Sequence, residues 1–253
     1  MRTVVITGGT RGIGGGLAAR LRAQGDEVIA IGSADADLTS VRQAADLADR
    51  LPDRIDVLVF AAGRFGAQRV VTTEGFEQTF ALYVLSRHLL AERLRPALEG
   101  AAQPVILNLC GTGGIPAGRI HWDDLQLTRG YSLLTATMQG ARANDLMGVA
   151  FADRDPGSRI RYVLYNPLFV DSGIHRYFRQ PTRALVGAAA RLLGSSVETA
   201  ARRLTDLLAD PPSAPLTALR RGKPVPLTAP EFDPTAAARL DATLRRLIAD
   251  VSI

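Results

Sequence analysis

The stretch Thr7-Gly8-Gly9-Thr10-Arg11-Gly12-Ile13-Gly14 follows the apolar residues 4–6 and precedes a helical pattern that includes Leu17 and Leu21. Glycine has no Cβ, so it lets the backbone turn tightly and approach a ligand closely. The N-terminus of the following helix offers unpaired N–H groups and the positive end of its dipole, which together bind phosphate. Strand, glycine turn and helix start therefore predict a site for the pyrophosphate of a nucleotide. The alternative interpretation is a tight turn that binds no ligand.

Strand-like and helix-like segments alternate along the rest of the chain. The expected strands are residues 3–7, 27–31, 55–60, 104–109 and 159–165, and the expected helices are 12–24, 41–51, 73–95, 133–152, 184–194, 196–209 and 234–249. This alternation predicts an α/β fold with one doubly wound parallel sheet and helices on both faces. We see no repeat and no clean domain boundary, so we expect a single domain over residues 1–253, in which the Pro-rich residues 211–230 form a connection.

The connection after the second strand is unusually short. Only Gly32-Ser33-Ala34 separates that strand from the segment Asp35-Ala36-Asp37-Leu38-Thr39. A crossover helix between parallel strands normally needs a dozen or more residues. Either the helix between the second and third strands is therefore missing, or the third strand is vestigial. Thr39 or Ser40 is expected to cap the next helix.

Composition limits the classes of protein that this chain can belong to. The formal charge is +5, but the arginines are interleaved with acidic residues rather than gathered in a stripe, so we do not expect nucleic-acid binding. No apolar run is long enough to span a membrane, and the chain enters a strand without a signal peptide. Its one cysteine, Cys110, cannot form an intrachain disulfide, which indicates a reducing cytoplasm.

Four motifs together resemble the short-chain dehydrogenase/reductase family. The pattern Thr-Gly-x-x-x-Gly-x-Gly at residues 7–14 is similar to that family's glycine loop. Ala61-Ala62-Gly63 resembles its Asn-Asn-Ala-Gly turn, and residues 166–172 resemble its Pro-Gly-x-Val-x-Thr segment, with Leu168 in place of the glycine. Asp37-Leu38 looks like its adenine-binding pair. Residues 123–144 and 234–249 look most like the retinol-dehydrogenase-like and protochlorophyllide-reductase-like branch, with residues 173–253 as a helical lid and C-terminal extension.

The resemblance implies a Rossmann-like domain that binds a nicotinamide dinucleotide. An NAD site usually places a carboxylate on the ribose hydroxyls, whereas the second strand here ends in Gly32-Ser33. Arg11 can reach a 2′-phosphate, so NADP(H) is favoured over NAD(H), with Asp35 as the counter-argument. No metal site is assigned. The expected cofactor-binding residues are Gly8, Thr10, Arg11, Gly12, Ile13, Gly14, Ser33, Asp37, Leu38, Ala61, Ala62, Gly63, Pro167, Val170 and Ser172.

The family's catalytic tetrad is absent from the positions where the resemblance places it. Its members use a tyrosine acid, a lysine that lowers the tyrosine's pKa, a substrate-orienting serine and a proton-relaying asparagine. The corresponding positions here are Thr137, Ala141, Gly111 and Tyr83. Lys223, the only lysine, lies far downstream. Arg142 is adjacent to the lysine position, but we expect it to face solvent.

Other side chains must then supply any proton. The candidates are Tyr131, Tyr83, Thr137 and Thr112, followed by His121 and His175. Each also has an ordinary structural interpretation, such as a packed tyrosine, a capping threonine or a surface histidine. Cys110 is expected to be a buried, inert thiol.

Three functions remain open. The first is an NADPH-dependent reductase of an activated acceptor, such as an enone, iminium or quinone, in bacterial specialised metabolism. The second is a redox-neutral cyclase, isomerase or lyase, and the third a non-catalytic partner subunit. Ile174, Tyr177, Phe178 and Trp122 suggest an apolar or aromatic small substrate. The resemblance also implies a possible homodimer through the helices at 73–95 and 133–152.

Overall fold

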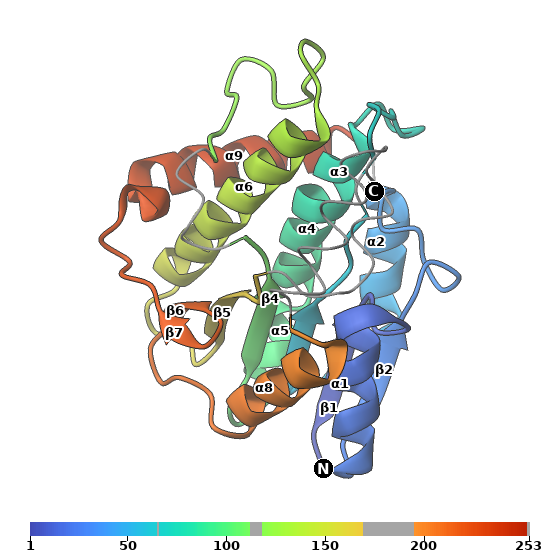
Figure 1. The fold of residues 1–253 in the computed structure, drawn as a ribbon, viewed down its shortest axis with the longest axis vertical. Helices are drawn as coiled ribbons and strands as arrows, with labels where there is room; N and C mark the ends of the chain where they lie inside the picture. Colours follow the sequence, from blue (N-terminus) through green and yellow to red (C-terminus); the bar gives the residue numbers. More distant parts are fainter. Residues whose placement is uncertain (65, 112–117, 169–194, 252–253) are drawn as a thin grey trace.

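A seven-stranded sheet forms the centre of the computed structural model, which describes residues 1–64, 66–111, 118–168 and 195–251 (Figure 1). Its strands lie in the order β2-β1-β3-β4-β5-β6-β7. All neighbouring pairs are parallel except β6 with β7. The bounds are Thr3–Thr7 (β1), Glu27–Ile31 (β2), Val57–Phe60 (β3), Val105–Leu109 (β4), Arg161–Asn166 (β5), Leu216–Arg220 (β6) and Lys223–Pro224 (β7).

The helices cover both faces of this sheet, as the alternating pattern predicts. Their bounds are Gly12–Ala23 (α1), Val41–Asp49 (α2), Gln78–Phe80 (α3), Ser86–Arg93 (α4), Arg95–Glu99 (α5), Leu133–Arg154 (α6), Val197–Ala209 (α8) and Pro234–Ala249 (α9). A π-helical turn, Ala81–Leu85 (η1), joins α3 to α4, and a 3-10 turn, Pro230–Phe232 (η3), precedes α9. Among the described residues, none of these helices has both the length and the apolar character that crossing a membrane requires.

Alternation along β1 shows how the two faces are filled. Val4 and Ile6 belong to a core cluster that also contains Leu17 of α1 and Leu204 of α8. Val5 points to the other face, into the larger cluster formed with α2, α4, α6 and α9. Successive side chains of a strand point to opposite faces, so a strand buried on both sides reads as a continuous apolar run. The doubly wound sheet is therefore confirmed.

The short connection after β2 contains neither a helix nor a strand. Residues 32–40 form turns that lead directly into α2, and β2 lies at the edge of the sheet. The crossover helix and the third strand that the sequence analysis considered are therefore both absent from residues 32–40. Ser40 caps α2, since its Oγ accepts a hydrogen bond of 3.2 Å from Gln43 N. The cap confirms one of the two predicted residues.

Two sequence-based boundaries are wrong. The expected helix 73–95 begins at Gln78, and the π turn η1 interrupts it before α4. The separate helix α5 follows α4 and contains Pro96 in its first turn. The expected connection 211–230 contains β6, whose Ala218 and Leu219 are buried through pairing with β5. A five-residue strand between prolines becomes recognisable only once its non-local partner is present.

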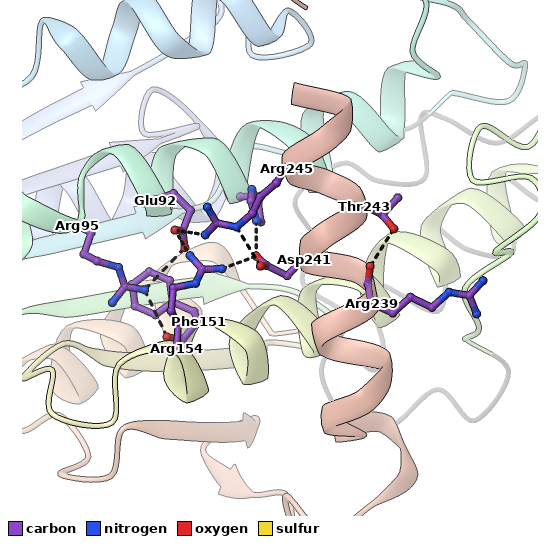
Figure 2. A network of polar contacts seen from close by, with 9 residues as sticks. Glu92, Arg95, Phe151, Arg154, Arg239, Asp241, Thr243 and Arg245 are labelled. Atoms are coloured by element: carbon purple, nitrogen blue, oxygen red, sulfur yellow. Dashed lines mark hydrogen bonds and ion pairs between the residues drawn. The ribbon is translucent and has the colours of Figure 1, made fainter. Parts of the chain in front are cut away.

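A network of ion pairs fastens α9 to α4 and α6 (Figure 2). The carboxylate of Asp241 on α9 lies 2.8 Å from His88 Nε2, 2.5 Å from Arg154 Nη2 and 3.0 Å from Arg245 Nε. Glu92 of α4 pairs with the same two arginines. One helix from the C-terminal part of the chain is thereby held against the helices that follow β3 and β4.

Asp241→Asn is expected to lower the free energy of unfolding by about 2–3 kcal/mol at pH 7, because the amide loses charge-assisted hydrogen bonds. Burial acts to raise the pKa of Asp241, but hydrogen bonds from His88 and Arg154 hold it below its ordinary value. A depressed carboxylate pKa stabilises the fold above the unfolded value of about 3.9, and this stabilisation disappears as the pH falls through the folded value. The difference between variant and parent should therefore shrink below about pH 4.

Urea unfolding followed by circular dichroism from pH 7 down to acid measures this difference. Asp206→Asn, an exposed change on α8, serves as the matched control and should have little effect at any pH. A loss of the same size at every pH would show that Asp241 stabilises α9 by packing rather than by its charge.

Candidate functional site

The turn between β1 and α1 lies close against the end of β3, with no room for side chains. Gly8 has a φ of +71°, and its N–H donates to Ile31 O of β2 at 2.8 Å. A Cβ on Gly8 would lie 2.6 Å from the backbone of Ala62, and a Cβ on Gly14 would lie 2.3 Å from Gly8 O. Glycine is therefore required at both positions. The result is a bare backbone cradle at the carboxyl edge of the sheet.

The first turn of α1 completes this cradle. The N-cap residue Arg11 makes no side-chain cap, and the first turn contains no acidic residue. The N–H groups at the start of a helix have no partner within the helix and carry its partial positive charge. Arg11 is exposed at the same point. These residues fit the pyrophosphate of a dinucleotide, which needs backbone donors and no nearby carboxylate.

At the end of β2, the carboxylate of Asp35 accepts a hydrogen bond of 2.7 Å from Gly32 N. Ser33 is exposed beside it, and the side chain of Thr10 lies against Gly32. The short connection thus brings an acidic group to the strand end where a nucleotide ribose binds in folds of this type. Asp35 and the exposed Arg11 are thus charged residues of opposite sign near the carboxyl ends of β2 and β1.

The predicted adenine pair has structural partners of its own. Asp37 Oδ1 accepts hydrogen bonds from Thr39 N at 3.0 Å and from Thr39 Oγ1 at 2.8 Å. Leu38 is buried in the core cluster beside α2. The pair lies next to the edge strand β2, and its contact with adenine stays a prediction.

After β5, the backbone at Leu168 adopts a conformation that favours glycine. Its φ is +56°, and its N–H donates to Asn166 Oδ1 at 2.8 Å. The segment that residues 166–172 resemble has glycine at this position, and a positive φ is one that glycine adopts readily. Pro167 lies within this turn. Val170, Ser172 and His175 lie outside the described residues, as does Thr112.

Tyr83 lies on the π turn η1, and its side chain reaches the end of β4. It is 8% exposed, and its hydroxyl lies 3.5 Å from Leu109 O at the end of β4. Its ring packs on α6 at Gly140, where a Cβ would approach Tyr83 Cδ1 to 2.6 Å. Burial raises the pKa of Tyr83 to about 12, against the opposing effect of the nearby Arg87 guanidinium. Its hydroxyl therefore stays protonated at neutral pH. π turns inserted in helices occur frequently at functional sites.

The other positions that the resemblance assigns to the tetrad hold no acid–base pair. Thr137 Oγ1 donates to Leu133 O within α6 at 2.7 Å, Ala141 is buried, and Gly111 is half-buried after β4. Arg142 does not face solvent as expected: its Nε donates to Gly118 O at 3.0 Å, and its Nη2 lies 3.7 Å from Glu231 Oε1. The expectation fails because η3 and α9 cover this side of α6.

The remaining candidates lie around the edge of this region. Tyr131 is half-buried, and its hydroxyl donates to Gly66 O at 3.0 Å. Burial raises its pKa as well. His121 is half-buried, and its backbone N–H donates to Gln139 Oε1 at 2.9 Å. Cys110 is buried after β4, as predicted.

Arg87 is the residue that the sequence reasoning missed. Its guanidinium lies 4.1 Å from the centre of the Tyr83 ring and donates to Leu109 O at 2.9 Å and to Ala62 O at 2.7 Å. It also donates to the side chains of Asn108 and Asn144. A signal was available, because Arg87 lies four residues after Tyr83 in the expected helix 73–95, and residues four apart share a helix face.

Known proteins resemble this chain in sequence and in fold, although no family model matches it. It is 33% identical over 210 residues to a candidate daunorubicin C-13 ketoreductase of Streptomyces sp. (strain C5), covering 70% of this chain and 71% of that protein. It is 27% identical over 285 residues to retinol dehydrogenase 13 of Homo sapiens, covering 98% of this chain and 84% of that protein.

Solved structures share the fold at lower sequence identity. The 3-alpha-hydroxysteroid dehydrogenase of Pseudomonas sp. B-0831, complexed with NADH, matches with a TM-score of 0.69 at 21% identity, over 87% of this chain and 96% of that chain. Other structures with this fold contain NADP or NADPH. Proteins that share this fold therefore include some that bind NADH, NADP or NADPH.

Proposed function

Because this chain belongs to the short-chain dehydrogenase/reductase family, in its retinol-dehydrogenase-like branch, we propose that it is an NADP(H)-dependent reductase with a non-standard active site. The observation that carries the proposal is the bare cradle at Gly8 and Gly14 together with a buried Tyr83, in a chain whose one lysine, Lys223, lies in β7. Reduced nicotinamide, when bound, supplies hydride to a carbon of the acceptor. The protein's part is to exclude water, orient the acceptor and provide a proton.

We assign the proton to the Tyr83 hydroxyl. Tyr83 comes from the π turn and reaches the end of β4, whereas Thr137 donates inside its own helix and Tyr131 donates to Gly66. With its pKa raised to about 12, Tyr83 can donate but does not accept a proton at neutral pH. This suits reduction better than oxidation, in which a base must remove the proton of an alcohol.

The acceptor class follows from the weakness of this acid. A simple ketone becomes an alkoxide on hydride addition and needs strong stabilisation, whereas a quinone, enone or iminium delocalises or neutralises the charge. We therefore propose an activated, apolar acceptor of bacterial specialised metabolism. The Streptomyces relative is named as a ketoreductase acting at C-13 of daunorubicin, which supports reduction of a carbonyl-containing acceptor and makes a simple ketone a necessary comparison in the test below. Trp122 supports an apolar acceptor less directly, because the guanidinium of Arg239 on α9 covers its ring, 4.1 Å from the ring centre.

Absorbance of NADPH during incubation with a quinone, an enone, an iminium and a simple ketone tests this function. Oxidation with at least one activated acceptor and little with the ketone is the expected result. Turnover of substrate with NADP⁺ and no change in cofactor absorbance would instead establish redox-neutral chemistry. No oxidation with any acceptor would overturn the proposal and favour a partner subunit.

The preference for NADP(H) is expected to depend on Arg11. Arg11→Ala should raise the Kd for NADPH by about tenfold or more, as expected for loss of a charged contact to the 2′-phosphate. The Kd for NADH should change little. The matched variant Asp35→Asn should act in the opposite sense and tighten NADPH. Calorimetric titration of both cofactors measures these constants, and tighter binding of NADH than NADPH by the parent protein would end the assignment.

For the homodimer, we propose a face other than the helices at 73–95 and 133–152 that the resemblance implies. In this chain α9 packs on α6, and Asp241 on α9 pairs with His88 of α4. A partner approaching α4 and α6 directly would have to displace α9. Sedimentation of the parent protein and of Asp241→Asn distinguishes these arrangements.

We also propose a cytoplasmic location, since the one cysteine, Cys110, lies buried and cannot form an intrachain disulfide.

A further inference from the structure

Arg87 is a buried cation at the point where β3, β4, η1 and α6 meet. It is 3% exposed. Its Nη2 donates to Ala62 O after β3, and its Nη1 donates to Leu109 O of β4. The same Nη1 reaches Asn144 Oδ1 of α6 at 3.3 Å and also bonds to Asn108 Oδ1. One guanidinium therefore binds three elements that are far apart in the sequence.

The charge of Arg87 is not balanced by an ion pair within the described part of the chain. All its hydrogen bonds there go to carbonyl and amide oxygens, and its remaining contact is the face of the Tyr83 ring. A guanidinium stays ionised under all ordinary conditions, and burying an uncompensated charge is costly. A purely structural tie could use neutral groups at lower cost. The positive charge itself therefore needs an explanation.

The same network fixes the position of Tyr83. Asn144 Nδ2 donates to Tyr83 O at 2.9 Å and to Gly140 O at 2.7 Å, which joins the π turn to α6. Asn108 Nδ2 donates to Asn144 Oδ1 at 2.8 Å and to the Tyr162 hydroxyl at 3.0 Å. The Tyr83 ring lies between Gly140 and the Arg87 guanidinium. Its hydroxyl has little freedom to move.

We propose that Arg87 is a positioning residue that orients Tyr83 and supplies the fixed positive charge that a lysine supplies elsewhere in the family. This inference rests on the proposed function. The Tyr83 hydroxyl gives its proton to the acceptor atom that gains negative charge, and the resulting phenolate takes a proton back from water. A preorganised cation beside the ring favours both the developing anion and the phenolate, without reorganisation during the reaction. The Arg87 guanidinium is permanently ionised, whereas the lysine of other family members can titrate.

A double-mutant cycle separates this role from simple structural support. Arg87→Gln should lower kcat by roughly 100-fold, and Arg87→Lys, which keeps the charge, should recover part of that loss. In a Tyr83→Phe background, the same changes at Arg87 should have almost no further effect on kcat, because residues that act through one another are not additive. Full additivity in folded variants would overturn the proposal.

A second readout does not depend on activity. With 3-fluorotyrosine in place of tyrosine, the ¹⁹F signal of Tyr83 is the one that Tyr83→Phe removes. Arg87→Gln should move its titration upward by about 1 pH unit or more, and Arg87→Lys should move it less. Cys110 and Asp145 also act to raise the pKa of Tyr83, so both residues remain unaltered in these variants.

Arg95→Gln is the matched control. Arg95 stacks over Phe151 at 3.8 Å, so its loss removes a comparable cation–aromatic contact without touching Tyr83. It should leave the Tyr83 titration in place. An unchanged Tyr83 titration in a folded Arg87→Gln protein would reject the positioning role. Absence of NADPH oxidation by the parent protein would reject the proposed function instead, while leaving the fluorine result interpretable.

Discussion

Gly14→Ala should raise the Kd for NADPH by about 100-fold, which corresponds to about 2.7 kcal/mol. The added Cβ would lie 2.3 Å from Gly8 O, which is backbone and cannot rotate away. The turn would have to open, and the N–H groups of the first turn of α1 would no longer converge on one point. A loss of about 1–3 kcal/mol in the free energy of unfolding should accompany this change, because the added Cβ overpacks against backbone that cannot rotate away.

Calorimetric titration with NADPH measures the affinity, and urea unfolding measures stability in the same samples. Gly100→Ala is a suitable control, since a Cβ there meets its nearest neighbour at an ordinary 3.4 Å. If Gly14→Ala remained folded and bound NADPH as tightly as the parent, the cradle would not be the pyrophosphate site.

The sequence was most informative where structure is determined locally. The apolar residues before Gly8 and the helical pattern after Gly14 depend on neighbours a few residues away, and both elements are present. The shortened connection after β2 could likewise be predicted from its length alone. The strand β6 could not, because Leu216–Arg220 is stabilised by pairing with β5, which lies 50 or so residues earlier.

The centre of the site was harder to predict for the same physical reason. Asn108, Asn144 and Arg87 were not among the site residues expected from the sequence. Each residue is unremarkable within its own element. They form a network only where β4, α4 and α6 pack together, because there the Arg87 guanidinium contacts both side-chain amides. The prediction that Arg142 faces solvent was wrong for a similar reason, because the orientation of Arg142 depends on Glu231 in η3.

Tyr83→Phe should lower kcat by at least about 100-fold, the usual contribution of a positioned proton donor. The Kd for NADPH should stay unchanged, because no predicted cofactor contact is lost. The free energy of unfolding should fall by no more than about 1 kcal/mol, since the hydroxyl's contact to Leu109 O is long at 3.5 Å. Because burial raises the pKa of Tyr83 to about 12, its ionisation should not shape kcat between about pH 6 and 10.

Two further tyrosine variants provide a control for this result and a test of the rival proton donor. Tyr165→Phe removes a hydroxyl from the core cluster on the opposite face of the sheet, so it should leave kcat intact. Tyr131→Phe tests the rival donor, whose hydroxyl is bonded to Gly66 O. If Tyr131→Phe abolished turnover and Tyr83→Phe did not, proton delivery would come from the loop before α6. Hydride transfer that survived both changes would mean that the acceptor takes its proton from water, and only a strongly activated acceptor reacts in that way.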